Sequence, residues 1–77
     1  PKDEYGTKGM ESDELNEVLS GLLSYINAYD FDGAANILDM LYDYNLDKDI
    51  QRRLKSVKKY ILAGDREKAA DALGMEG

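Results

Sequence analysis

The residues of this 77-residue chain that could do chemistry gather first in the stretch AYDFDGAANIL, residues 28–38. Asp30 and Asp32 precede Gly33 there, an order that occurs in the loop of a calcium-binding EF-hand. With Gly33 as the central glycine, the loop starts at Ala28, and Asp39 takes its twelfth position. Ala28 has no side-chain oxygen for the first ligand, and calcium prefers a bidentate glutamate at the twelfth. We therefore prefer a helix cap as the role of Asp30. A small calcium-binding module that uses the Asp30–Asp32 turn is the alternative.

The other candidate catalytic groups are a serine–lysine pair and pairs of carboxylates. Ser56 and Lys59 have the Ser-x-x-Lys spacing of some acylating hydrolases. That chemistry also needs an oxyanion hole and a cleft, for which a small helical chain leaves little room. A general acid needs a buried carboxyl group, whereas the acidic pairs fall on polar helix faces. These pairs are Asp13 with Glu17 and Asp39 with Asp43. We expect a protein that is not an enzyme, with no catalytic residue, no cofactor and no metal.

Composition narrows the classes of site further. The chain has no cysteine and no histidine, so it offers no thiolate or imidazole as nucleophile, base or metal ligand. The missing cysteines favour a cytoplasmic location. No apolar run approaches the length of a membrane span or a signal peptide, so we expect no membrane partner.

The net charge of −6 is unevenly distributed along the chain. Residues 1–50 contain three Lys or Arg against twelve Asp or Glu, and residues 51–77 contain seven against four. An acidic chain is a poor candidate for nucleic-acid binding, because neutralised phosphates supply most of that affinity. The basic stretch RRLKSVKKYI, residues 52–61, could form a peptide-binding or membrane-surface helix. The simpler interpretation is that its cations solvate the outer face of a helix, so we expect no nucleic-acid partner.

Four segments have the apolar spacing of three and four residues that is typical of amphipathic helices. They are residues 13–28, 31–43, 48–63 and 66–74. Asp30 and Asp65 are suited to cap the second and fourth helices, and Ser12 or Asp13 to cap the first. Asn45 is suited to a left-handed position after the second helix.

Because short loops place consecutive helices antiparallel, the spacing predicts an all-α fold of two stacked antiparallel helical hairpins. This would be a four-helix, right-handed, repeat-like bundle. Residues 1–11 are polar and glycine-containing, so we expect a flexible linker or tail there and a single helical domain over residues 12–77. The start at Pro1 favours a fragment of a longer protein.

An internal sequence repeat favours the helix-cap interpretation of Asp30 over the calcium-loop interpretation. The segment YINAYDFDGAANIL, residues 25–38, aligns without a gap on YILAGDREKAADAL, residues 60–73, with seven of fourteen residues identical. The aspartate at position 30 recurs as Asp65, whereas Asp32 and Gly33 become Glu67 and Lys68. A cap explains both copies, and a metal site explains only one.

The spacing of residues in this internal repeat resembles that of a known repeat family. Tyr25 and Tyr60 are each followed nine residues later by an alanine, Ala34 and Ala69, on a repeat of about 35 residues. This spacing resembles the tetratricopeptide helix-turn-helix repeat over most of residues 13–75, and the resemblance implies stacked helical hairpins that bind proteins.

More loosely, YDFDGAANILDML, residues 29–41, is similar to helical segments that follow receiver or phosphotransfer modules in bacterial hybrid sensor histidine kinases. This resemblance implies an accessory piece of a two-component signalling protein. A chain without histidine cannot be the phosphotransfer module itself.

These observations predict a non-catalytic protein-interaction or accessory module of a larger, cytoplasmic, bacterial two-component signalling protein. The predicted contact surface combines aromatic residues near helix ends, where a half-buried ring can serve a partner, with an acidic face. Its residues are Tyr29, Tyr42, Tyr44, Asp39 and Asp43. The expected partner is another protein or a neighbouring domain of the same chain. A homodimer is left open, because two hairpins can leave an apolar face uncovered.

Overall fold

Four helices make up the fold, as the apolar spacing predicts. The computed structural model describes residues 5–74 and places the helices α1, α2, α3 and α4 at Ser12–Asn27, Phe31–Leu41, Lys48–Leu62 and Arg66–Leu73. Each predicted helix is present, and the bounds differ by no more than two residues. Within the described residues the only β pairing is one isolated bridge between Lys8 and Tyr44. The prediction of an all-α fold is confirmed.

Asp30 and Asp65 cap the two hairpins in the same way. A carboxylate oxygen of Asp30 accepts the backbone N–H of Gly33 at 3.1 Å, and one of Asp65 accepts that of Lys68, also at 3.1 Å. Each bond satisfies one of the amides that the first turn of a helix leaves without a partner. The predicted caps of α2 and α4 are therefore confirmed.

The backbone just before each cap also repeats with an offset of 35 residues. The Asp30 N–H donates to the carbonyl of Tyr25, and the Asp65 N–H donates to that of Tyr60, both at 2.9 Å. These bonds belong to a Schellman motif, which closes a helix through a residue of left-handed conformation. That residue is Tyr29 in the first turn, with φ 61°, and Gly64 in the second, with φ 74°.

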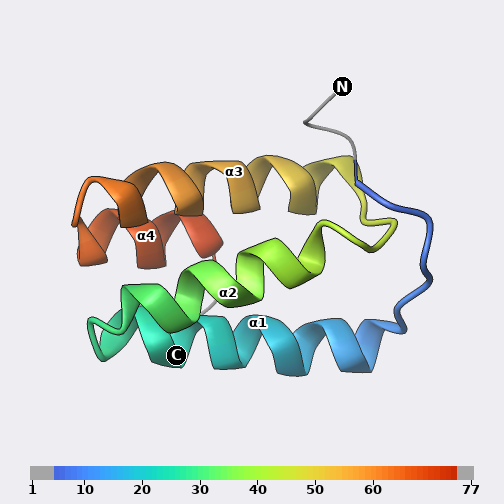
Figure 1. Ribbon diagram of the computed structural model, residues 1–77, viewed down its shortest axis with the longest axis horizontal. Coiled ribbons are helices and arrows are strands. Elements are labelled where there is room, and N and C mark those ends of the chain that lie inside the picture. Colours follow the sequence, from blue (N-terminus) through green and yellow to red (C-terminus); the bar gives the residue numbers. More distant parts are fainter. Residues whose placement is uncertain (1–4, 75–77) are drawn as a thin grey trace.

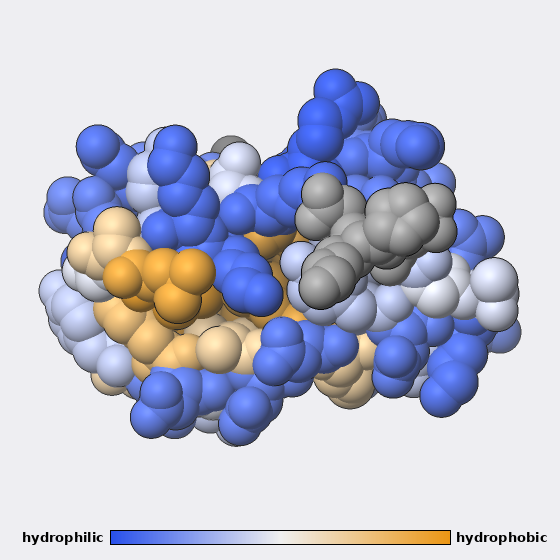
Figure 2. Space-filling model, turned by 45° about the horizontal axis from the view of Figure 1, so that its top comes forward, coloured by the Kyte–Doolittle hydropathy of each residue, from blue (hydrophilic) through white to orange (hydrophobic). Residues whose placement is uncertain are grey.

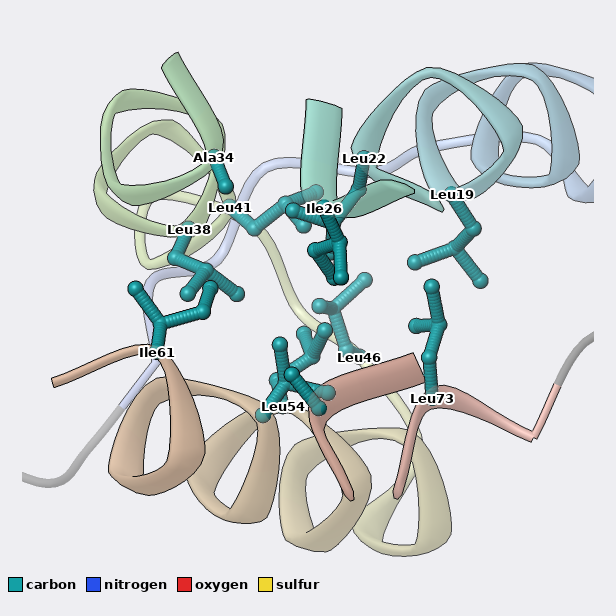
Figure 3. Close-up of a cluster of buried hydrophobic side chains, with 12 residues drawn as sticks. Leu19, Leu22, Ile26, Ala34, Leu38, Leu41, Leu46, Leu54, Ile61 and Leu73 are labelled. Atoms are coloured by element: carbon teal, nitrogen blue, oxygen red, sulfur yellow. The ribbon is translucent and has the colours of Figure 1, made fainter. Parts of the chain in front are cut away.

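The core follows the same offset. Within residues 5–74 twelve apolar side chains are buried, and ten of them form five pairs 35 residues apart. The pairs are Leu19 and Leu54, Leu22 and Val57, Ile26 and Ile61, Ala34 and Ala69, and Leu38 and Leu73. Figure 3 shows these side chains meeting between the helices, with Leu46 joining them from the loop after α2. No polar or charged residue is buried within residues 5–74.

The two hairpins close on each other. Contacts join α1 with α2, α2 with α3, α3 with α4, and α4 with α1. Figure 1 shows the helices running in alternating directions, with both hairpin turns at the same end. The four helices therefore close into a ring in which each hairpin contacts the other through both of its helices.

Some local predictions differ from the structure. The N-cap of α1 is Glu11 rather than Ser12 or Asp13, and its N–H donates to the Glu14 side chain at 3.4 Å. Asn45 is not left-handed; positive φ among the described residues outside glycine occurs only at Tyr29. The N–H of Asn45 instead donates to the Lys8 carbonyl at 2.8 Å, next to the isolated bridge between Lys8 and Tyr44.

Candidate functional site

The five residues of the predicted contact surface lie at two ends of α2. Tyr29 precedes this helix, whereas Asp43, Tyr42 and Tyr44 follow it. A helix of eleven residues is about 16 Å long, so Tyr29 lies too far from the other two tyrosines to share one small contact with them. We call the end with both hairpin turns the turn end, and the opposite end, with residues 42–47, the loop end.

At the loop end, Tyr42 and Tyr44 contact the chain's own residues 5–8. The Tyr42 ring stacks on Tyr5 with centroids 4.7 Å apart, and its carbonyl accepts the Gly6 N–H at 2.6 Å. The ammonium group of Lys8 lies 6.0 Å from the Tyr44 ring centroid. Both tyrosines are half-buried, so much of their surface serves this internal contact. The division of the chain at residue 11 stays a prediction, but residues 5–8 are attached here.

Two further features show how closely this segment is held. A Cβ atom on Gly6 would overlap the carbonyl group of Asp43, so only glycine fits there. Burial, with a smaller effect of neighbouring Tyr42, raises the pKa of Tyr5 from 10.0 to about 12. Burial disfavours the charged phenolate, and Tyr5 is therefore neutral at physiological pH.

The acidic residues of the prediction are available to solvent. Asp39 and Asp43 are both exposed, as are Asp13 and Glu17. Exposed carboxylates contribute surface charge, and the buried carboxyl that a general acid requires is not found at these positions.

At the turn end, Tyr29 lies between the two hairpins. Its ring centroid is 5.9 Å from that of Phe31 and 5.4 Å from the guanidinium carbon of Arg66. Arg66 also donates to the side-chain oxygen of Asn27 over 3.4 Å. A side-chain hydrogen bond with Tyr29 raises the pKa of Arg66 above its already high value. The turn end thus combines an aromatic ring with a permanent positive charge, and 66% of Tyr29 is exposed.

Tyr29 adopts a backbone conformation that tyrosine disfavours. The left-handed region costs a non-glycine residue about 1–2 kcal/mol, and the equivalent residue of the second hairpin is glycine. The sequence prediction included Tyr29 for its ring and missed this conformation. The alignment of Tyr29 with Gly64 in the internal repeat was the signal that could have predicted a left-handed conformation at Tyr29.

The sequence prediction missed two residues of the turn end, Arg66 and Leu62. Leu62 is the last residue of α3, and 78% of its surface is exposed. In the first hairpin its counterpart 35 residues earlier is Asn27, a polar residue that binds Arg66. Figure 2 shows hydrophobic surface gathered at the left of the view, the side on which the turns lie in Figure 1.

The metal and serine–lysine candidates are not assembled into sites. The Asp30 carboxylate accepts a backbone N–H in the cap, and residues 5–74 contain no group of three or more acidic side chains placed to hold a metal ion. The Lys59 ammonium lies 5.5 Å from the ring of Tyr60, the next residue, and no bond joins it to Ser56 within the described contacts.

Comparisons of the chain with protein-family models, with curated proteins and with solved structures found no match. None of the four described helices combines the length and the apolar character that crossing a bilayer requires.

Proposed function

We propose that the chain is a non-catalytic protein-interaction module, an accessory part of a larger bacterial two-component signalling protein that works in the cytoplasm. The observation that supports it most is Tyr29, which combines a strained backbone with a largely exposed ring. Glycine would occupy this turn at lower cost, as Gly64 does in the other hairpin. A tyrosine at this position is explained if its side chain contacts a partner.

The neighbours of Tyr29 suit contact with another protein. Tyrosine and arginine are among the residues that contribute most to protein–protein affinity, and Arg66 lies against the Tyr29 ring. Leu62 adds an exposed apolar side chain at the same end of the bundle. The turn-end surface, which we define as Tyr29, Leu62 and Arg66, is therefore the preferred contact. Tyr42 and Tyr44 contribute less, because residues 5–8 cover part of them.

The resemblances agree with this proposal. Helical hairpins repeated at about 35 residues are the units with which tetratricopeptide proteins bind partners, and the present turns repeat bond by bond at that offset. The similarity of residues 29–41 to segments of hybrid sensor kinases is the basis for the signalling context. The calcium alternative has no such support, because the Asp30 carboxylate is used by the cap.

The proposal is tested by photo-crosslinking in the natural full-length protein, expressed in its own cells. A photoreactive amino acid replaces Leu62 in one form and Met40 in the other. Met40 is a matched control, since it is also exposed, at 40%, but lies near the far end of α2. We expect a defined product with one protein or one neighbouring domain only from position 62, identified by mass spectrometry.

Tyr29→Gly should reduce the yield of that crosslinked product, because the substitution removes the ring and keeps the turn. Failure to obtain a defined product at position 62, or equal products at positions 62 and 40, would overturn the proposal.

A further inference from the structure

The second hairpin has a surface groove lined by charged residues. The groove lies between α3 and α4 and has a volume of about 530 Å³. Its walls contain three cations, one acid and three uncharged residues. They are Arg52, Arg53, Lys68, Asp71, Ser56, Tyr60 and Ala72. Local charge is thus positive here, although the whole chain carries −6.

The tyrosine ring is placed differently in the two hairpins. Tyr25, the counterpart of Tyr60, lies so close to Gly33 that a Cβ atom there would stand 2.8 Å from the ring. The second hairpin has Lys68 in place of Gly33. The Cβ atom of Lys68 therefore prevents the Tyr60 ring from lying as the Tyr25 ring does. Lys68 instead extends along the ring, with its ammonium 5.9 Å from the centroid.

Two other exchanges enlarge the groove and charge it. Ala72 corresponds to Ile37, which packs against the core of the first hairpin, and the smaller side chain leaves space. Arg53 corresponds to Val18, another residue packed against the core. At these two positions the first hairpin has apolar side chains, whereas the second has a smaller residue and a cation.

We infer that the α3–α4 groove binds an acidic peptide segment of a partner protein. Its volume lies within the range of sites that hold drug-sized ligands and exceeds the needs of a simple anion. Tyr60 and Ala72 can contact the body of a peptide, and the cations can pair with its carboxylates. This site shares no residue with the turn-end surface and does not depend on it.

The positions of the cations define the spacing of the acids. The Arg53 guanidinium lies beside Gly74, with Nη1 3.5 Å from where its Cβ would be, and Lys68 lies six residues earlier on α4. Six helical residues span about 9 Å. In polyproline II conformation, common in unbound chains, side chains three residues apart share a face and are separated by about 9 Å. A segment with two acidic residues three positions apart has a spacing of this order and is the probe to use.

Screening lets this local charge act although the protein is acidic overall. At physiological salt, charges separated by more than about 8 Å are largely screened, so the groove's own cations dominate for a ligand seated in it. Arg52 contributes less, since its guanidinium pairs with Asp49 at 2.9 Å. Arg53 and Lys68 are the residues to test.

The test uses NMR titration of the ¹⁵N-labelled chain with a blocked hexapeptide that has two glutamates three positions apart and a phenylalanine between them. We expect shifts at the amides of Ser56, Tyr60 and Ala72. The glutamine version of the peptide should bind about tenfold more weakly, because two exposed charge pairs are worth roughly 1–2 kcal/mol together.

The matched variant replaces Arg53→Val and Ala72→Ile, which gives the second hairpin the residues of the first. It should lose about tenfold in affinity. If this variant does not fold, Lys68→Gln tests the same contact with little effect on packing. Tyr29→Gly should leave peptide affinity unchanged, and Arg53→Val should leave the Leu62-site crosslink unchanged, so the two proposals fail separately.

Three results would overturn the inference. One is no binding of the glutamate peptide at millimolar concentration. Another is equal affinity of the natural chain and the groove variant. The third is a single-stranded oligonucleotide that shifts the groove amides when the peptide does not, since this would assign the groove to nucleic acid.

Discussion

The left-handed backbone of Tyr29 makes a prediction whose sign is unusual. In a helix interior, alanine is more stabilising than glycine by about 1 kcal/mol. At Tyr29 the order should be reversed, because φ is 61° and only glycine adopts that region without a Cβ clash. We expect the Tyr29→Gly variant to be more stable than Tyr29→Ala by about 1 kcal/mol.

The comparison with the natural protein follows from the ring contacts. Both variants lose the contacts of the ring with Arg66 and with Phe31, and an aromatic pair alone is worth about 0.5–1.5 kcal/mol. Tyr29→Ala keeps the backbone strain, so it should be destabilised by about 1–2 kcal/mol. Tyr29→Gly recovers the strain and should lie within about 1 kcal/mol of the natural protein.

Urea unfolding followed by circular dichroism measures these differences by linear extrapolation. For a domain of this size, 1 kcal/mol corresponds to a change in Tm of about 4–8 °C. Gly64→Ala is the control, because Gly64 has φ 74° and open space around it; its cost should match the alanine–glycine difference at Tyr29. An alanine variant at Tyr29 as stable as the glycine variant would refute the assigned conformation.

Three further predictions concern the caps, the half-buried phenol of Tyr5 and calcium. Asp30→Ala and Asp65→Ala should each lower the free energy of unfolding by about 1 kcal/mol in urea titrations, since each carboxylate accepts one N–H; a cost at only one of them would contradict the shared cap. In ultraviolet titration of phenolate, one tyrosine should ionise near pH 12, and Tyr5→Phe should remove that step. Because the folded-state pKa of Tyr5 is raised, its contribution to stability is complete below pH 10 and is lost as the pH rises toward 12. Calcium up to millimolar concentration should leave Tm unchanged, because the Asp30 carboxylate is engaged in the cap; a calcium-dependent rise in Tm would restore the metal alternative.

The repeated core carries a consequence for stability. Leu22 and Val57 occupy equivalent positions, and both are fully buried. Truncating a fully buried leucine costs about 2–5 kcal/mol, which is a large share of the stability of a small domain. The buried side chains of both hairpins form one cluster, so neither hairpin can bury its apolar face without the other, and we expect both hairpins to unfold together.

The elements of the fold were predictable because their signals are local. The apolar stripes, the aspartate caps and the glycine at residue 64 act within about five residues along the chain, and the structure shows four helices close to the predicted bounds. The equivalence of the two hairpin turns was predictable for the same reason, since two similar short segments can form the same short-range hydrogen bonds. The prediction of a left-handed conformation at Asn45 was wrong for the opposite reason. The conformation of Asn45 depends on Lys8, which lies far away in sequence.

What the sequence by itself determined is therefore the helices, the aspartate caps of α2 and α4, and the equivalence of the two hairpins. Tertiary structure alone decided that Tyr29 lies at the opposite end of α2 from Tyr42 and Tyr44, that residues 5–8 cover those two rings, and that a cationic groove opens between α3 and α4. These features arise where helices meet. Such meetings depend on the fit of side chains distant in sequence, about which the spacing within any one helix contains no information.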